Sequence, residues 1–231
     1  MLTVHHLDNS RSQRVLWLLE ELELSYELVS HPHPKQAHQA SASLKKIHPL
    51  AKAPILCDGE LVIAETGAIF EYLIDTYAHQ RLQPQLATVA RLDYNYWRHF
   101  SEASFMPYLA MKLLFSAMQQ KTPWPAKLII RFIARTVEKL YLNPNIYAEL
   151  DYIEAHLSKQ RWFAGDEFSA ADILISFPIE AVAVSMAAAN KYPYIHDFVN
   201  RIRSRPAYAR AVNKGAWSKA EHEQYWAGLG H

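Results

Sequence analysis

The stretch Leu7-Asp8-Asn9-Ser10-Arg11-Ser12-Gln13-Arg14 joins two different sequence patterns. Before it, the short apolar run of residues 2–7 is typical of a β-strand. After it, apolar residues recur at helical spacing over residues 14–24. A polar turn therefore leads from a strand into a helix N-terminus, where outward-pointing backbone N–H groups and the helix dipole favour negative charge. The turn is a candidate anion site, and a thiolate is one anion that it could hold.

The first eighty residues alternate between strand and helix patterns. After the first helix we expect a strand at 26–29, an irregular stretch at 30–43, a helical turn at 44–47, strands at 53–57 and 61–64, and a helix at 68–77. Asp58-Gly59 between the last two strands is a strong hairpin signal. The first two strands should pair in parallel and the last two antiparallel. The order β-α-β-α-β-β-α predicts a thioredoxin-like α+β domain over residues 1–79.

The rest of the chain contains no convincing strand pattern. Residues 80–87 read as a linker, and residues 88–231 as an all-α helical-bundle domain. Its predicted helices lie at 88–119 with a bend near Pro107, at 126–158 with an interruption at Asn143-Pro144, at 170 to about 189, near 194–203 and near 206–213. Ser169 and Asp172 form a capping-box-like start for the third of these helices. That helix is apolar nearly all round, which predicts the core of the second domain.

Composition and charge narrow the class of protein. The 231 residues are 50% hydrophobic and 20% charged, which is typical of a globular chain. A formal net charge of +1 gives no broad attraction to nucleic acid or to anionic membranes. The one cysteine, Cys57, allows no intrachain disulfide and fits a reducing compartment. We expect no signal peptide and no membrane span, so the cytoplasm is the predicted location.

Motifs along nearly the whole chain resemble those of the soluble glutathione transferases. Residues 7–14 resemble the first turn of the serine-type members, in which a serine stands four positions before an arginine. Residues 47–56 resemble the family's Asn-Pro-x-Gly-x-x-Pro-x-Leu stretch, Glu65–Ile69 its Glu-Ser-x-Ala-Ile motif, and Ser169–Ile173 its second-domain helix cap. The first eighty residues are most similar to a group found in fungi and bacteria.

The resemblance implies a glutathione S-transferase that conjugates the thiolate of reduced glutathione to small apolar electrophiles in detoxification. Glutathione would be a co-substrate, and no cofactor is expected. Ser10 would donate its hydroxyl proton to the sulfur anion, with Asn9 and Ser12 as possible substitutes. A thiol pKa near 8.5 must fall by about two units, which needs about 2.7 kcal/mol. The alternative is that Ser10 is only a helix N-cap.

The same resemblance also implies which residues bind the other parts of glutathione. A cis peptide bond at Ala53–Pro54 would let Ala53 pair with the cysteinyl backbone like an added strand. Thr66 would bind the γ-glutamyl carboxylate at a helix start, and Glu65 the γ-glutamyl ammonium. Lys52 could meet the glycine carboxylate. His48 and Ala51 replace the family's usual Asn and Gly, so how the glycine end is held stays open.

The second substrate is expected between the two domains. Phe105, Tyr108 and Lys112 recur at helical spacing, and Trp217 could close the site. The alternative is that these aromatic residues serve core or dimer packing. The helices at 68–77 and 88–104 are the expected homodimer face of such proteins.

Two other functions stay open. One is a non-catalytic glutathione- or protein-binding scaffold of the same fold, and the other is glutathione-dependent hydroperoxide reduction as a side activity. Dithiol chemistry is excluded because the turn at residues 9–12 holds no cysteine.

Histidines and the lone cysteine give only weak signals. His31, His33 and His38 lack a completing set of Cys or carboxylate ligands, so no metal is expected. His5 and His6 should point to opposite faces of their strand. Cys57 is interpreted as a partly buried strand residue without a redox role.

Overall fold

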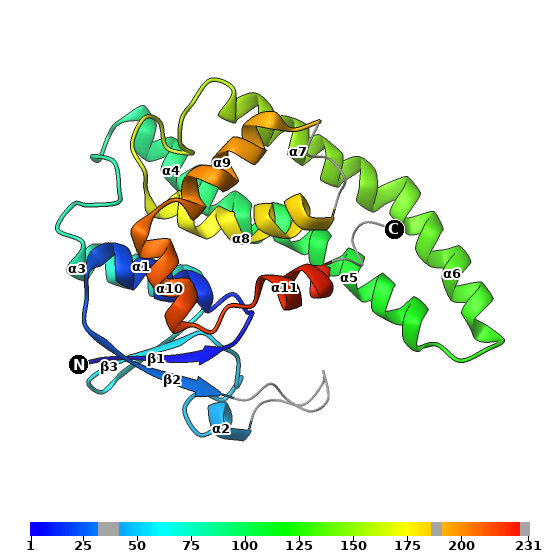
Figure 1. The fold of residues 1–231 in the computed structure, drawn as a ribbon, viewed down its shortest axis with the longest axis horizontal. Helices are drawn as coiled ribbons and strands as arrows, with labels where there is room; N and C mark the ends of the chain where they lie inside the picture. The colour runs from blue at the N-terminus through cyan, green and yellow to red at the C-terminus, as the bar shows by residue number, and fades with distance from the viewer. Residues whose placement is uncertain (32–41, 186–190, 227–231) are drawn as a thin grey trace. The chain divides into compact units, whose positions relative to one another are not determined.

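The computed structural model describes residues 1–31, 42–185 and 191–226 (Figure 1). Its internal contacts divide the chain into two compact units: unit 1 holds residues 1–91 and 201–219, and unit 2 holds residues 92–200 and 220–231. Unit 1 contains β1 (Leu2–Leu7), α1 (Gln13–Leu22), β2 (Tyr26–His31), α2 (Ala42–Lys45), β3 (Ile55–Asp58), β4 (Leu61–Ala64), α3 (Thr66–Tyr77) and α10 (Pro206–Lys214). The predicted β-α-β-α-β-β-α order of a thioredoxin-like domain is confirmed. The predicted domain limits at residues 79 and 88 remain predictions.

Four strands form one mixed sheet in the order β2-β1-β3-β4. Strand β1 pairs with β2 in parallel, and β3 pairs antiparallel with both β1 and β4. The predicted hairpin is confirmed, because Asp58 pairs with Leu61 across a two-residue turn. Gly59 has a φ of 59°, a left-handed conformation that glycine adopts without steric cost.

Helix α1 is buried almost all round, although its sequence predicts one apolar face and exposed glutamates. Glu20 is only 6% exposed, because α10 covers the second side of α1. The Glu20 carboxylate accepts from Arg210 Nε at 2.8 Å and from Lys214 Nζ at 2.6 Å, and Glu21 accepts from Arg205 Nε at 2.6 Å. The glutamates of α1 are therefore buried because they form ion pairs with a distant segment of the chain, whereas local periodicity predicts them at the surface.

The remaining described elements are helical: α4 (Val89–His99), η1 (Phe100–Phe105), α5 (Met106–Lys121), α6 (Ala126–Val137), η2 (Glu138–Leu142), α7 (Asn143–Leu157), α8 (Ala170–Ser185), α9 (Pro193–Arg203) and α11 (Lys219–Trp226). The η segments are π-helical, and each lies just before a predicted bend, at Pro107 or Pro144. Proline has no N–H to donate and crowds the preceding turn, so a widened turn there relieves both problems. Helix α11 had no counterpart among the predicted helices.

The start of α8 confirms most of the predicted capping box. Asp172 Oδ2 accepts from the Ser169 backbone N–H at 2.8 Å and from the Ser169 hydroxyl at 3.0 Å, and Oδ1 accepts from the Phe163 N–H at 2.9 Å. The N–H of Asp172 goes to the Ser169 carbonyl at 3.1 Å and not to its hydroxyl. Helix α8 is buried along its described length to Val182, as predicted for a core helix. The predicted continuation to residue 189 lies partly outside the described residues.

Candidate active site

The register of the sheet brings three turns of unit 1 to one end. Ile55, the first residue of β3, pairs with His5 of β1 and with Ala64 of β4. Ala53–Pro54 therefore precede β3 at the end where β1 leads into its turn and where β4 leads into Glu65–Thr66. Neighbouring strands are about 4.8 Å apart, so β1 and β4 lie about 10 Å from each other. That is about the length of an extended tripeptide.

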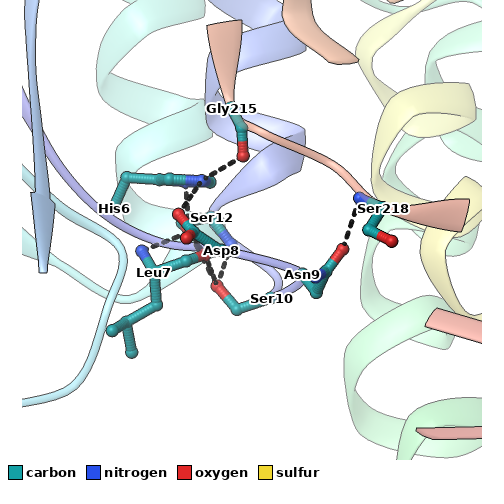
Figure 2. Close-up of polar contacts among 8 residues, drawn as sticks. All are labelled: His6, Leu7, Asp8, Asn9, Ser10, Ser12, Gly215 and Ser218. Atoms are coloured by element: carbon teal, nitrogen blue, oxygen red, sulfur yellow. Dashed lines mark hydrogen bonds and ion pairs between the residues drawn. The ribbon is translucent and has the colours of Figure 1, made fainter. Parts of the chain in front are cut away.

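Ser10 lies in the first of these turns with a half-buried side chain (Figure 2). Its Oγ is 2.8 Å from the Leu7 carbonyl oxygen and 2.7 Å from Ser12 Oγ, and it accepts from the Ser12 N–H at 3.2 Å. The hydroxyl proton thus has two alternative acceptors. Helix α1 starts later, with Ser12 at its N-cap position and no side-chain cap bond. Ser10 therefore braces the turn before the helix and does not cap the helix itself.

A chain of hydrogen bonds continues from Ser10 into the interior. Ser12 and His6 are fully buried; Ser12 Oγ lies 2.7 Å from His6 Nδ1, and His6 Nε2 lies 3.0 Å from the Gly215 carbonyl oxygen (Figure 2). A carbonyl can only accept, so Nε2 carries the hydrogen and Nδ1 accepts from the Ser12 hydroxyl. Ser12 Oγ also accepts from the Leu7 N–H at 3.2 Å. Hydrogen bonds to the buried Ser12 and His6 therefore stabilise the turn on its interior side.

Two residues near the end of the chain hold this turn, and no sequence motif marked them. Gly215 supplies the carbonyl for His6, and the Ser218 N–H donates to Asn9 Oδ1 at 2.8 Å (Figure 2). A Cβ on Gly215 would lie 2.1 Å from Gln13 Oε1 and 2.8 Å from Leu16 Cδ1. Only glycine allows this approach to α1. Its place just after the predicted helix at 206–213 was the one available signal, typical of a helix end.

The other two turns carry the remaining predicted glutathione residues. The Ala53–Pro54 peptide bond is cis, as predicted, with Pro54 buried and Lys52 exposed. Glu65 is exposed and has a φ of 71°, and Thr66, 6% exposed, begins α3. A positive φ at a residue other than glycine costs about 1–3 kcal/mol and is concentrated at ligand sites. Glu65, one of nine described residues other than glycine with a positive φ, lies where a helix N-terminus can receive an anion.

Comparisons with known proteins agree with this geometry. Residues 1–75 match the model of the glutathione S-transferase N-terminal domain, and residues 102–206 match that of the C-terminal domain. Glutathione S-transferase 3 of Schizosaccharomyces pombe is 34% identical over 215 residues, covering 93% of this chain and 88% of the relative. Glutathione S-transferase 1 of Saccharomyces cerevisiae is 33% identical over 225 residues, covering 93% of this chain and 95% of the relative.

The chain belongs to the glutathione S-transferase family. A solved glutathione S-transferase from Actinobacillus pleuropneumoniae has the same fold, with a TM-score of 0.76, 31% identity and coverage of 94% of both chains. The similarity to fungal relatives agrees with the resemblance found in the first eighty residues.

The residues predicted to bind the second glutathione S-transferase substrate lie in different environments. Phe105 is fully buried with its ring stacked 6.2 Å from that of Phe100, and Lys112, 4% exposed, donates to Asn143 Oδ1 at 3.1 Å. Burial of Phe105 fits the alternative interpretation for the aromatic residues, core packing. Tyr108 is half-buried beside Tyr141, at a ring distance of 5.8 Å.

Trp217 belongs to unit 1, whereas the other three residues belong to unit 2. It is half-buried, and its backbone N–H donates to the Val212 carbonyl at 3.1 Å. Its role toward an electrophile remains a prediction, as do those of Phe105, Tyr108 and Lys112.

The weak signals have local structural explanations. His5 and His6 point to opposite faces, as predicted: His6 is buried, and His5 Nδ1 lies 3.0 Å from His31 Nε2. Burial lowers the pKa of both His5 and His31. Burial also raises the pKa of the Cys57 thiol, which keeps it protonated.

His33 and His38 lie outside the described residues. Within the described part of the chain, no three His, Cys, Asp or Glu side chains come together as a metal site.

Proposed function

We propose that this protein catalyses the attack of the glutathione thiolate on small apolar electrophiles, in detoxification. The observation that carries the proposal is Ser10. Its half-exposed hydroxyl stands before α1, at the end of the sheet shared with Ala53–Pro54 and Glu65–Thr66. Family membership supports the activity, and the geometry supports the choice of residue.

Ser10 is suited to hold a sulfur anion because its proton can be redirected at little cost. When Ser10 donates to the thiolate, Ser12 keeps its bonds to the Leu7 N–H and to His6 Nδ1, and Ser10 Oγ still accepts from the Ser12 N–H. Ser12 is itself fully buried, so Ser10 is better placed than Ser12, and the side-chain amide of Asn9 stays the alternative donor.

The proposed reaction begins when glutathione binds and its thiol proton passes to solvent. The sulfur anion lies against the Ser10 hydroxyl and the N-terminus of α1, which has no acidic residue in its first turn to compete. The sulfur then forms a bond to the electrophilic carbon, and the leaving group departs with its electron pair. The rate gain comes from stabilising the thiolate and from holding the two reactants together.

The remainder of glutathione would extend along the end of the sheet. Ala53 would pair with the cysteinyl backbone, the first N–H groups of α3 with Thr66 would bind the γ-glutamyl carboxylate, and Glu65 would bind its ammonium. The exposed Lys52 would meet the glycine carboxylate. Glutathione is a co-substrate in this proposal, and no cofactor takes part.

We extend the proposal to a cytoplasmic homodimer. On α4, Val89, Leu92 and Tyr96 are 76%, 68% and 45% exposed, which gives that helix an outward apolar surface suited to self-association. In the described part of the chain no helix has the length and apolar character needed to cross a membrane.

Conjugation of a chlorinated dinitroaromatic to glutathione tests the activity, followed by absorbance of the product. We expect saturable turnover that requires glutathione. Calorimetric glutathione binding is measured on the same protein. Binding without turnover over several electrophiles, hydroperoxides included, would replace the transferase by a glutathione-binding scaffold.

A further inference from the structure

Helix α6 turns its apolar side away from the protein. Leu128, Ile129, Phe132 and Ile133 are 63%, 64%, 72% and 45% exposed, whereas Ala134 on the opposite side is fully buried. The spacing i, i+1, i+4, i+5 puts the four exposed side chains on one face. A helix at a protein surface ordinarily buries such a face. Here α5 packs against α6, and η2 continues the helix directly after Val137.

Further exposed apolar side chains lie on the segments next to α6. Helices α5 and α6 form a helical hairpin closed by the Thr122–Pro125 turn (Figure 1). Trp124 in that turn is 80% exposed, Leu140 after α6 is 72% exposed, and Leu114 on α5 is 59% exposed. Isolated exposed apolar residues are common, but a run of them along one helix and its turn marks a binding surface.

The charged residues of the segment that contains α6 have one sign. Residues 103–137 contain no Asp or Glu. The cations of the segment are Lys112, Lys121, Lys127, Arg131 and Arg135, followed by Lys139. Lys127, Arg131 and Arg135 recur every fourth residue, so they line one flank of the apolar face. The nearest acid, Glu138, is buried at 9% exposure and faces the interior. The net charge of +1 for the whole chain conceals this local concentration.

We propose that α6 and the Thr122–Pro125 turn dock the protein on an anionic lipid bilayer. Phe132, Ile129 and Trp124 enter the boundary between headgroups and acyl chains, and Arg131 and Arg135 lie among the anionic headgroups. A strongly amphipathic helix with cations on its flank and Phe, Leu and Trp on its apolar face is suited to lie in that plane. The long arginine side chains reach the headgroups while their stems cover apolar surface.

The charge pattern favours a lipid surface over a second copy of the chain. A symmetric pairing of α6 with α6 would bring two rows of cations together, and residues 103–137 contain no carboxylate to pair with them. With 12 residues, α6 is about 18 Å long, too short to span a bilayer core of about 30 Å. The helix therefore fits the surface of a membrane and not its interior.

Sedimentation with vesicles tests the proposal on the full chain. We expect binding to vesicles of phosphatidylcholine containing phosphatidylglycerol, much weaker binding to phosphatidylcholine alone, and release by added salt. Arg131→Gln with Arg135→Gln should lower the partition coefficient by about ten-fold or more. Ile129→Ser with Phe132→Ser should lower it similarly. Lys45→Gln with Lys46→Gln, which removes two exposed cations of unit 1, is the matched control and should bind like the parent.

Tryptophan fluorescence shows which part of the protein contacts the lipid. Trp17, Trp97, Trp162 and Trp226 are at most 6% exposed, so Trp124 is the tryptophan best placed to report lipid insertion. We expect vesicle binding to shift the emission to the blue, lipids brominated in their acyl chains to quench it, and Trp124→Phe to abolish both effects. Retained conjugation of the chlorinated dinitroaromatic shows that each variant is folded and active.

Three results would overturn the proposal. These are no sedimentation with anionic vesicles, equal sedimentation of the parent and all α6 variants, or self-association that the α6 substitutions abolish without any vesicle binding. A protein that binds vesicles but conjugates nothing would overturn the proposed function and leave this inference intact.

Discussion

Two helix starts in this protein use serine in opposite ways. At the start of α8, Asp172 and Ser169 are 0% and 2% exposed, and the carboxylate takes three hydrogen bonds. Before α1, Ser10 is half-exposed, and no acidic residue stands in the first turn of the helix. Helix α8 thus carries its own anion, whereas the N-terminus of α1 is left for the anion of a ligand. This difference in exposure and charge distinguishes the structural cap of α8 from the proposed binding turn before α1.

The largest effect is expected from removing the anion of α8. Asp172→Ala would leave the buried N–H groups of Phe163 and Ser169 without their acceptor, which costs about 3 kcal/mol and lowers the thermal midpoint by roughly 10 °C. Thermal unfolding followed by circular dichroism measures it. Asp166→Ala, at an exposed position of the preceding loop, is the control and should unfold like the parent. Equal midpoints for both variants would contradict a structural role for Asp172.

Gly215→Ala tests the support behind the binding turn. The added Cβ would lie 2.8 Å from Leu16 Cδ1, so either α1 or the Gly215 backbone must move, at about 1–3 kcal/mol. Because the Gly215 carbonyl accepts from His6, we expect lower conjugation turnover as well as a lower thermal midpoint. Gly67→Ala, whose Cβ would meet nothing within 4 Å, should leave the midpoint unchanged or raise it. Loss of stability with normal turnover would separate Gly215 from the site.

Paired substitutions of the two serines sharpen the comparison directly. Ser10→Ala should raise the pKa of bound glutathione and lower turnover by about ten-fold or more, because one charge-assisted hydrogen bond to the thiolate is lost. Ser169→Ala should cost about 1 kcal/mol of stability and leave turnover unchanged. Thiolate absorbance, initial rates and thermal midpoints of both variants measure this. Turnover and thiol pKa like the parent's in Ser10→Ala would move the role to Asn9 or Ser12.

Local chemistry made part of this architecture predictable. The strand order, the Asp58-Gly59 hairpin and the reach of Asp172 back to Ser169 each depend on residues close together in the sequence. The cis bond before Pro54 was predicted from the resemblance to the glutathione transferases. The two π-helical segments also lie beside prolines that predicted a bend, although their form could not be foreseen.

Long-range contacts could not be predicted. Gly215 and Ser218 hold a turn about two hundred residues earlier, and a single sequence gives no signal for such pairing. Periodicity shows that α6 has an apolar face, but not whether that face turns inward. Burial of Glu20 likewise depends on α10, which supplies Arg210 and Lys214.

The smallest effect is expected at Glu149, because its carboxylate lacks hydrogen-bond donors of the kind that Asp172 has. Glu149 Oε2 is buried and accepts no hydrogen bond from the described residues, and burial raises the pKa of Glu149 from 4.5 to about 7. The folded state therefore holds this proton more tightly than the unfolded state, so stability falls as the pH rises from about 4.5 to 7. Because the side chain is only partly buried, the loss is on the order of 1 kcal/mol.

Glu149→Gln should remove this part of the pH dependence, which urea unfolding at pH values below and above that interval measures. The variant should gain stability relative to the parent only at the higher pH. Glu167→Gln, at an exposed position in the same unit, should change neither value. Parallel pH profiles for the parent and Glu149→Gln would show that Glu149 is solvated. The protein would then tolerate a carboxylate without hydrogen-bond donors at this depth. In that case the three hydrogen bonds to Asp172 would stabilise α8 less than the comparison of the two helix starts requires.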